Sequence, residues 1–116
     1  MSPSPPAPAP ELRAPLAGLV KFFDWNRPQQ AEAMEISVKG VFLKTAQPLA
    51  EDRLLTLRLQ LPGDGARAFT VLGRVGRTVK GNPFRAGGMD VRFVDLPAAD
   101  RAAIEAYVRR RTLRAA

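Results

Sequence analysis

Residues 55–61 read Leu-Thr-Leu-Arg-Leu-Gln-Leu, with a leucine at every second position and a polar side chain at each position between. This alternation is typical of a strand with one buried face, because successive side chains of a strand point to opposite faces. The turn-forming residues 62–65, Pro-Gly-Asp-Gly, then end the strand. The segment therefore predicts a β-sheet with one apolar face as the basis of the core.

The same period of two recurs along most of the chain. Strands are expected at residues 18–24, 33–38, 41–45, 54–61, 69–75 and 88–93. Residues 25–28, Trp-Asn-Arg-Pro, are expected to form the turn after the first strand, and Lys39-Gly40 a tight bend. The spacing of these segments predicts six short antiparallel strands.

The apolar period changes at residues 95–97, Asp-Leu-Pro. Beyond them Ala103, Ile104, Tyr107 and Val108 share one stripe of a helix. The pattern predicts a helix over residues 98–111, followed by a basic tail over residues 112–116. The expected fold is mainly β: a six-stranded antiparallel barrel, whose closure removes exposed sheet edges, with one C-terminal α-helix.

The length and the N-terminal composition predict a single domain. A chain of 116 residues has room for one core, which we place at residues 11–111. Residues 1–10 contain five prolines and are expected to be a disordered or extended leader. They show no secretory signal, and no apolar stretch approaches the roughly 20 residues of a membrane helix. We expect a cytoplasmic protein without membrane insertion.

The absence of whole residue types excludes several kinds of chemistry. The chain has no cysteine and no histidine, which excludes disulfides, thiolate or imidazole zinc sites and a histidine base. Its serines are Ser2, Ser4 and Ser37, and no carboxylate pair has a recognisable catalytic spacing. We expect neither an enzyme nor a metal site nor a cofactor.

The charge favours an anionic partner without identifying it. Eighteen basic and eleven acidic side chains give a net charge of +7 and a pI near 11.0. Much of this excess lies in Arg109-Arg110-Arg111 and Arg114, where a solvated helix end suits the helix dipole. The alternative is a contact with nucleic acid or an anionic membrane. No aromatic residue is interleaved with these arginines, which argues against a base-stacking platform.

One segment carries a more specific pattern. Residues 35–43 read Glu-Ile-Ser-Val-Lys-Gly-Val-Phe-Leu, so that Glu35, Ser37 and Gly40 precede an apolar strand. This segment resembles the second signature of PilZ domains: Asp or Asn, any residue, Ser, two residues, then Gly. The order of the surrounding segments is similar too, since residues 54–61 run into Leu-Pro-Gly and residues 88–93 precede the closing helix. The resemblance covers residues 11–108.

The resemblance implies a small six-stranded barrel and a regulatory ligand, cyclic di-GMP, which many PilZ domains bind. In such a site Glu35 would accept hydrogen bonds from a guanine edge, and Ser37 would contact phosphate or base. Gly40 would let the backbone approach the ligand and adopt a positive φ. Arg13 would supply guanidinium contacts to phosphate or guanine. Each residue also has a purely local interpretation: a solvent-facing charge, a backbone hydrogen-bonder, a bend between strands and a surface arginine.

The chain departs from the family pattern at the arginines. Binding members carry Arg-x-x-x-Arg before the first strand, whereas residues 12–17 read Leu-Arg-Ala-Pro-Leu-Ala. Leu16 or Ala17 stands where the second arginine belongs, and we do not expect Arg27, at the far end of the first strand, to replace it. At about 1.5 to 3 kcal/mol per charge-assisted contact, one missing arginine weakens binding about 10- to 100-fold.

Three hypotheses follow. The first is a signalling or motility adaptor with a degenerate cyclic di-GMP site, binding a protein partner through Leu12, Pro15 and Leu16, which would form an apolar surface. The alternative is a working cyclic di-GMP receptor that uses Arg13, Glu35, Ser37 and Gly40. A second alternative is a basic barrel that binds nucleic acid, whose affinity would fall steeply with salt.

Overall fold

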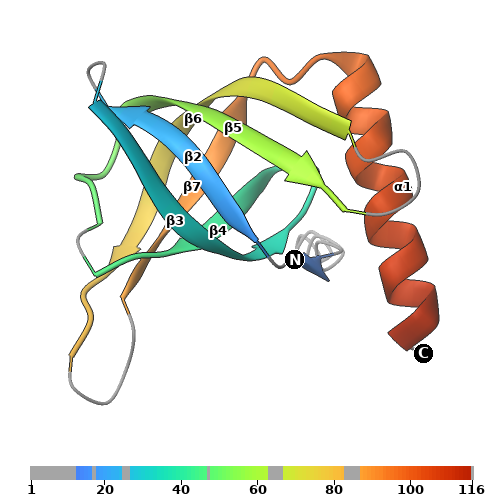
Figure 1. Ribbon diagram of the computed structural model, residues 1–116, viewed down its shortest axis with the longest axis horizontal. Helices are drawn as coiled ribbons and strands as arrows, with labels where there is room; N and C mark the ends of the chain where they lie inside the picture. Colours follow the sequence, from blue (N-terminus) through green and yellow to red (C-terminus); the bar gives the residue numbers. More distant parts are fainter. Residues whose placement is uncertain are drawn as a thin grey trace, which may run out of the picture.

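The computed structural model describes residues 13–16, 18–24, 27–46, 48–62, 67–82 and 87–115. The side chains of Leu19, Asp24, Arg67 and residues 112–115 are outside this description. Within it, the elements in chain order are β1 (Ala14–Pro15), β2 (Leu19–Asp24), β3 (Arg27–Ile36), β4 (Gly40–Lys44), β5 (Leu54–Leu61), β6 (Arg67–Val79), β7 (Gly88–Val94) and α1 (Ala98–Ala115) (Figure 1).

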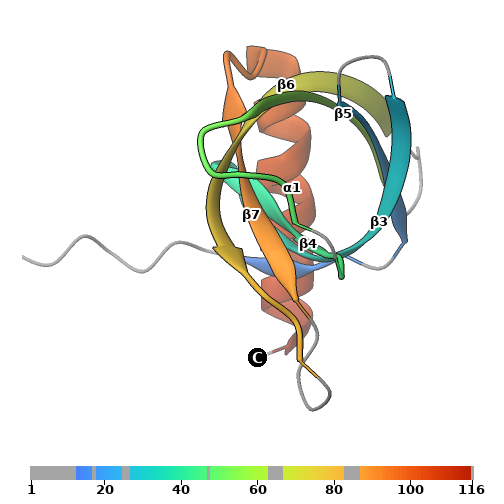
Figure 2. The same ribbon diagram turned by 90° about the vertical axis from the view of Figure 1, so that its left-hand side faces the viewer.

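The strands form one closed antiparallel sheet. Their order is β1-β3-β2-β5-β6-β7-β4, and the additional pairing of β3 with β4 joins the two ends. Strands β2 to β7 thus make a ring of six, seen end-on in Figure 2, while β1 adds to β3 beyond the stretch that pairs with β2. The mainly β fold, a six-stranded barrel with one C-terminal helix, is confirmed.

The core fills the barrel with the alternate side chains of these strands. The leucine stripe that defined the fold lies inside, with Leu55, Leu57, Leu59 and Leu61 each at most 5% exposed. Glycine is required where β6 and β7 approach: a Cβ on Gly73 would stand 2.5 Å from the Val91 side chain. Close packing of this kind fixes the register of β5, β6 and β7.

Two strands are longer than the apolar pattern predicts. β3 begins at Arg27, so the predicted turn over residues 25–28 is wrong for Arg27 and Pro28, which pair with Asp24 and Phe23. Residues 27–30 carry no apolar alternation because their side chains lie largely in solvent. β6 reaches Val79, with an irregularity in its pairing to β7 between Val75 and Thr78. A β-bulge of this kind interrupts the period of two.

The helix packs against one end of the barrel (Figure 1). Ile104, Tyr107 and Val108 are buried, which confirms the predicted stripe. The Tyr107 hydroxyl donates a hydrogen bond of 2.7 Å to the carbonyl oxygen of Pro15, so the helix holds β1 in place. The helix continues to Ala115 rather than ending at residue 111, which corrects the separate tail predicted over residues 112–116.

The predicted leader, residues 1–10, lies outside the described residues. None of the described helical residues forms a segment long and apolar enough to cross a membrane.

Candidate functional site

The segment entering the barrel lies along the second half of β3. Ala14 pairs with Ile36 and Pro15 with Glu35, and the Leu16 amide donates to the Met34 carbonyl oxygen at 3.2 Å. This register brings the Arg13 guanidinium to the Glu35 carboxylate, with 3.0 Å between Nη1 and Oε1. Both side chains are nearly half exposed, at 47% and 44%, so the ion pair stands in solvent.

The motif serine stabilises the turn between β3 and β4. The Ser37 amide donates to the Gly40 carbonyl oxygen at 2.9 Å, and the Lys39 amide donates to Ser37 Oγ at 3.1 Å. The Phe93 amide of β7 donates to the Lys39 carbonyl oxygen at 2.9 Å, which fixes the turn against the barrel. With only 4% of its surface exposed, Ser37 has a local backbone role, as short hydroxyl side chains often do in turns.

The motif glycine is required by the close approach of β7. A Cβ on Gly40 would overlap the carbonyl oxygen of Val91 and stand 3.1 Å from the Cα of Arg92. The expected positive φ is not present at Gly40; among the described glycines it occurs at Gly18, with φ of 133°. The need for glycine therefore comes from packing between strands rather than from backbone conformation.

Residues paired across β3, β4 and β7 place further side chains beside Arg13 and Glu35. Glu35 is opposite Phe42, and Phe42 is opposite Asp90, so β3, β4 and β7 contribute neighbours to one outer face. Next to Asp90 lies the bulge of β6 with Gly76 and Arg77. A Cβ on Gly76 would stand 3.9 Å from Asp90 Oδ2 and 4.0 Å from Arg92 Nε, which shows that these groups face the bulge.

These side chains surround an open depression of about 570 Å³, which we call the motif depression. Its lining residues are Arg13, Glu35, Phe42, Gly76, Arg77, Val79, Asp90 and Arg92. A recess of about 30 Å³ shares several of them and adds Ile36, Ser37, Lys39 and Gly40. The structure therefore brings together all four residues predicted for the ligand site: Arg13, Glu35, Ser37 and Gly40.

Sequence reasoning missed the cations that other strands supply. Arg77 comes from the bulge of β6 and Arg92 from β7, and Lys39 comes from the turn. With Arg13 they make four cations, against the two carboxylates of Glu35 and Asp90. The outward position of Arg92 followed from the alternation of residues 88–93. The bulge that turns Arg77 into the depression had no signal in the sequence.

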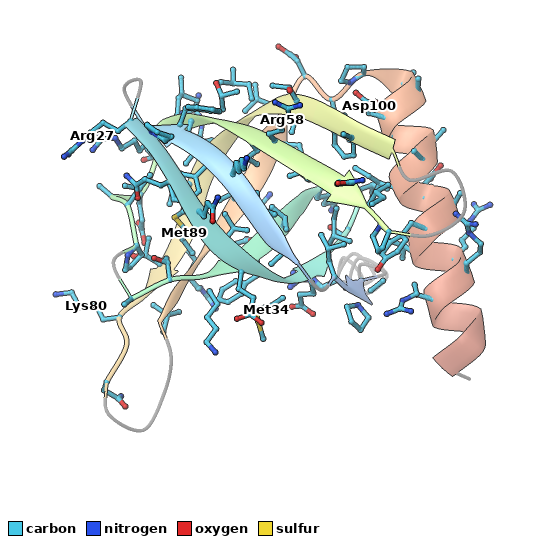
Figure 3. All side chains as sticks on the ribbon, in the orientation of Figure 1. Arg27, Met34, Arg58, Lys80, Met89 and Asp100 are labelled. Atoms are coloured by element: carbon cyan, nitrogen blue, oxygen red, sulfur yellow. The ribbon has the colours of Figure 1, made fainter. Side chains whose placement is uncertain are left out.

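The predicted surface role of Leu16 is corrected. Leu16 was expected on a partner-binding surface, but its side chain is 2% exposed and belongs to the hydrophobic core. A cation in its place would be buried, so this position cannot supply the second arginine of the family pattern. Pro15 is exposed as expected, and Leu12 lies outside the described residues. Arg27 lies at the far end of β3 from Met34, the neighbour of Glu35, and takes no part in the motif depression (Figure 3).

Comparison with known proteins gives the class of this chain. A family model for the PilZ domain matches residues 11–110, and the chain belongs to that family. PilZ domains are regulatory modules rather than enzymes. No curated protein sequence matches the chain.

Two solved structures share the fold. The Bacillus subtilis inhibitor of motility, MotI/DgrA, superposes with a TM-score of 0.81 at 19% identity, over 93% of this chain and 53% of that one. This chain thus spans about half the length of that protein. The PilZ domain of YcgR from Escherichia coli, solved with c-di-GMP, superposes with a TM-score of 0.69 at 10% identity, over 94% and 95% of the two chains.

Proposed function

We propose that this chain is a regulatory PilZ domain of bacterial signalling or motility that acts through a protein partner and whose cyclic di-GMP site is degenerate. One observation carries the proposal: the entering segment offers Arg13 alone, and the side chain at position 16 is an apolar core residue. The second arginine of the pattern Arg-x-x-x-Arg is absent, because position 17, four residues after Arg13, is alanine and Leu16 beside it is buried. Arg13 itself is already engaged with Glu35.

The energetic consequence is a large loss of ligand affinity. A ligand phosphate would compete with the Glu35 carboxylate for Arg13, although an exposed ion pair stabilises by only about 0 to 1 kcal/mol. The missing arginine is the larger effect, at about 1.5 to 3 kcal/mol for a charge-assisted hydrogen bond. A ligand that normally binds at micromolar concentration would then need about 10 to 100 times more to occupy the site.

A specific observation favours a second candidate, a working cyclic di-GMP receptor. Arg77 and Arg92 line the motif depression together with Arg13, and its three cations exceed its two carboxylates, Glu35 and Asp90. Cyclic di-GMP is a dianion, and guanidinium groups bind phosphate and guanine edges well. The volume of the depression, about 570 Å³, lies in the range of small-molecule sites. The related PilZ domain of YcgR was solved with this ligand.

Isothermal titration of the full chain with cyclic di-GMP tests the proposal. We expect no saturable heat up to a ligand concentration of about 100 µM. The variant Arg92→Ala removes a cation from the motif depression, and Arg58→Ala removes an exposed cation from β5 as the matched control. A micromolar dissociation constant that Arg92→Ala weakens and Arg58→Ala preserves would establish the receptor and overturn the degenerate site.

A further inference from the structure

A band of apolar side chains crosses the outer wall of the barrel. Phe23 of β2 is opposite Thr56 of β5, Thr56 is opposite Leu72 of β6, and Leu72 is opposite Val94 of β7. Leu54 lies on the same face, two residues before Thr56. We call these five residues the apolar band. Its three large exposed side chains, Phe23, Leu54 and Leu72, are 39%, 49% and 41% exposed.

Cations flank the apolar band on both sides. On one side Lys21 is opposite Arg58, and on the other Arg74 is opposite Arg92. All four side chains are exposed, and none of them forms an ion pair with another described residue. The described partners that continue these two rows carry no charge: Gln30, Thr70, Gly40 and Leu54, the band residue opposite Arg74. This wall of the barrel is therefore apolar along its centre and positively charged along its margins.

We infer that this wall is a docking surface for an acidic protein segment that carries apolar side chains. Contiguous exposed apolar side chains mark interaction sites, and flanking charges select a partner of opposite sign. The partner's carboxylates would meet the two cationic margins while its apolar side chains cover the band. The inference rests on the proposed function for the existence of a partner and adds where, and by what chemistry, it binds.

The same observations disfavour other occupants. A second copy of this chain would place eight like charges against one another, because each copy brings Lys21, Arg58, Arg74 and Arg92. Nucleic acid binds through phosphate contacts and base stacking, and Phe23 is the one aromatic side chain of the band, beside aliphatic leucine and valine. The exposed side chains Phe23, Leu54 and Leu72 are about half covered by neighbouring residues. Membrane-surface binding of the usual kind uses an amphipathic helix with a long apolar face, and this wall is a sheet with three large exposed apolar side chains.

Photo-crosslinking tests the surface directly. Thr56, at the centre of the band, is replaced by p-benzoylphenylalanine in the full chain, which is expressed in its native host and irradiated. The matched control carries the same residue in place of Glu105, an exposed position on α1. We expect Thr56 to yield a protein adduct that the control lacks, and mass spectrometry to place it in an acidic segment with apolar residues. The inference would be overturned by an adduct with a second copy of this chain, with nucleic acid, with lipid or with a basic protein segment. It would also be overturned if Thr56 gave no specific adduct.

A binding titration with the cross-linked segment, made as a synthetic peptide, then tests the chemistry. We expect Leu72→Asp and Arg58→Glu each to weaken binding by about tenfold or more, since each removes complementarity at the band or its margin. Arg109→Glu, on the exposed face of α1, should leave it within about twofold. All three side chains are exposed, so we expect the thermal unfolding of the variants to be unchanged. A change in affinity can then be assigned to the binding surface. Equal affinities for all four proteins would contradict the inference.

The two proposals fail separately. Tight cyclic di-GMP binding with retained cross-linking at Thr56 would overturn the degenerate site and leave the docking surface standing. Absence of both the nucleotide heat and the Thr56 adduct would overturn the docking surface alone.

Discussion

Ser37 and Gly40 stabilise the backbone arrangement of the barrel. The hydroxyl of Ser37 accepts the Lys39 amide, and the backbone of β7 occupies the space that a side chain at position 40 would need. Selection for the fold alone can therefore retain both residues after ligand binding is lost. Their presence is consistent with the family, and the proposed loss of nucleotide binding rests on the arginines instead.

Gly40→Ala should destabilise the protein by about 1 to 3 kcal/mol, because the added methyl group forces β4 and β7 apart. The matched control is Gly76→Ala, where a Cβ meets the Asp90 carbonyl oxygen at an ordinary 3.6 Å. We expect that control to change the free energy of unfolding by less than about 1 kcal/mol. Urea denaturation measures both variants, and equal losses would show that the approach of β7 is not what selects glycine.

Leu16→Glu should lower the free energy of unfolding by about 3 kcal/mol or more, because it buries an unpaired carboxylate among core side chains. Met34→Glu places the same charge in the same β1–β3 contact on a side chain that is 45% exposed, and it should cost under about 1 kcal/mol. Chemical denaturation compares the two. A stable, folded Leu16→Glu variant would contradict the burial of this residue and restore it as a surface residue.

At the scale of elements, α1 and β1 depend on one another. The two-residue strand β1 has few hydrogen bonds of its own, and the Tyr107 hydroxyl binds the Pro15 carbonyl oxygen from the helix. Since Arg13 directly precedes β1, the helix also helps to position the one arginine of the entering segment. This connects the C-terminal helix to the motif depression across 92 residues of sequence.

Tyr107→Phe removes only this hydroxyl and should destabilise the protein by about 1 kcal/mol, the usual contribution of one intramolecular hydrogen bond. Hydrogen exchange at Leu16, whose amide binds Met34, should quicken more than exchange in β5, because β1 loses its anchor. Arg109→Ala, on the exposed face of α1, serves as the control and should change neither quantity. Uniform acceleration across the barrel in Tyr107→Phe would contradict a local anchoring role.

The sequence predicts well those elements in which buried side chains recur at a regular spacing. The alternation at Leu55–Leu61 and the stripe of Ile104, Tyr107 and Val108 both follow directly from one buried side. With two residues, β1 is too short to show an alternation of apolar and polar residues. The first residues of β3 lie largely in solvent, so they show no such alternation either. These segments become strands through pairing with residues far along the chain, which local patterns do not contain.

In the whole molecule, the sequence predicts one part of the candidate site, and the arrangement of the barrel strands supplies the other part. Arg13, Glu35, Ser37 and Gly40 follow from the resemblance to the family, and the fold brings them together. Arg77 and Arg92 reach the same depression only because β7 pairs with both β4 and β6 and because β6 bulges beside Asp90. The strand register and the bulge are set by closure of the barrel, so the sequence alone does not predict that these two arginines lie at the site.

The central claim is that the absence of a second arginine at the family position removes cyclic di-GMP binding from this chain. Because Leu16 is buried in the core, the repair is made by Ala17→Arg, which completes the spacing Arg-x-x-x-Arg from Arg13. It is combined with Glu35→Asp, which restores the Asp of the family signature. The control, Pro15→Arg with Glu35→Asp, adds the same charge at an exposed position with the wrong spacing. Circular dichroism establishes that both variants remain folded.

Calorimetric titration of these two variants and the natural chain with cyclic di-GMP is the most direct measurement. We expect Ala17→Arg/Glu35→Asp to gain at least about tenfold in affinity over the natural chain, and the Pro15→Arg control to gain less than about threefold. Binding by the natural chain as tight as that of the repaired variant would contradict the account, because the cations of the motif depression would then suffice.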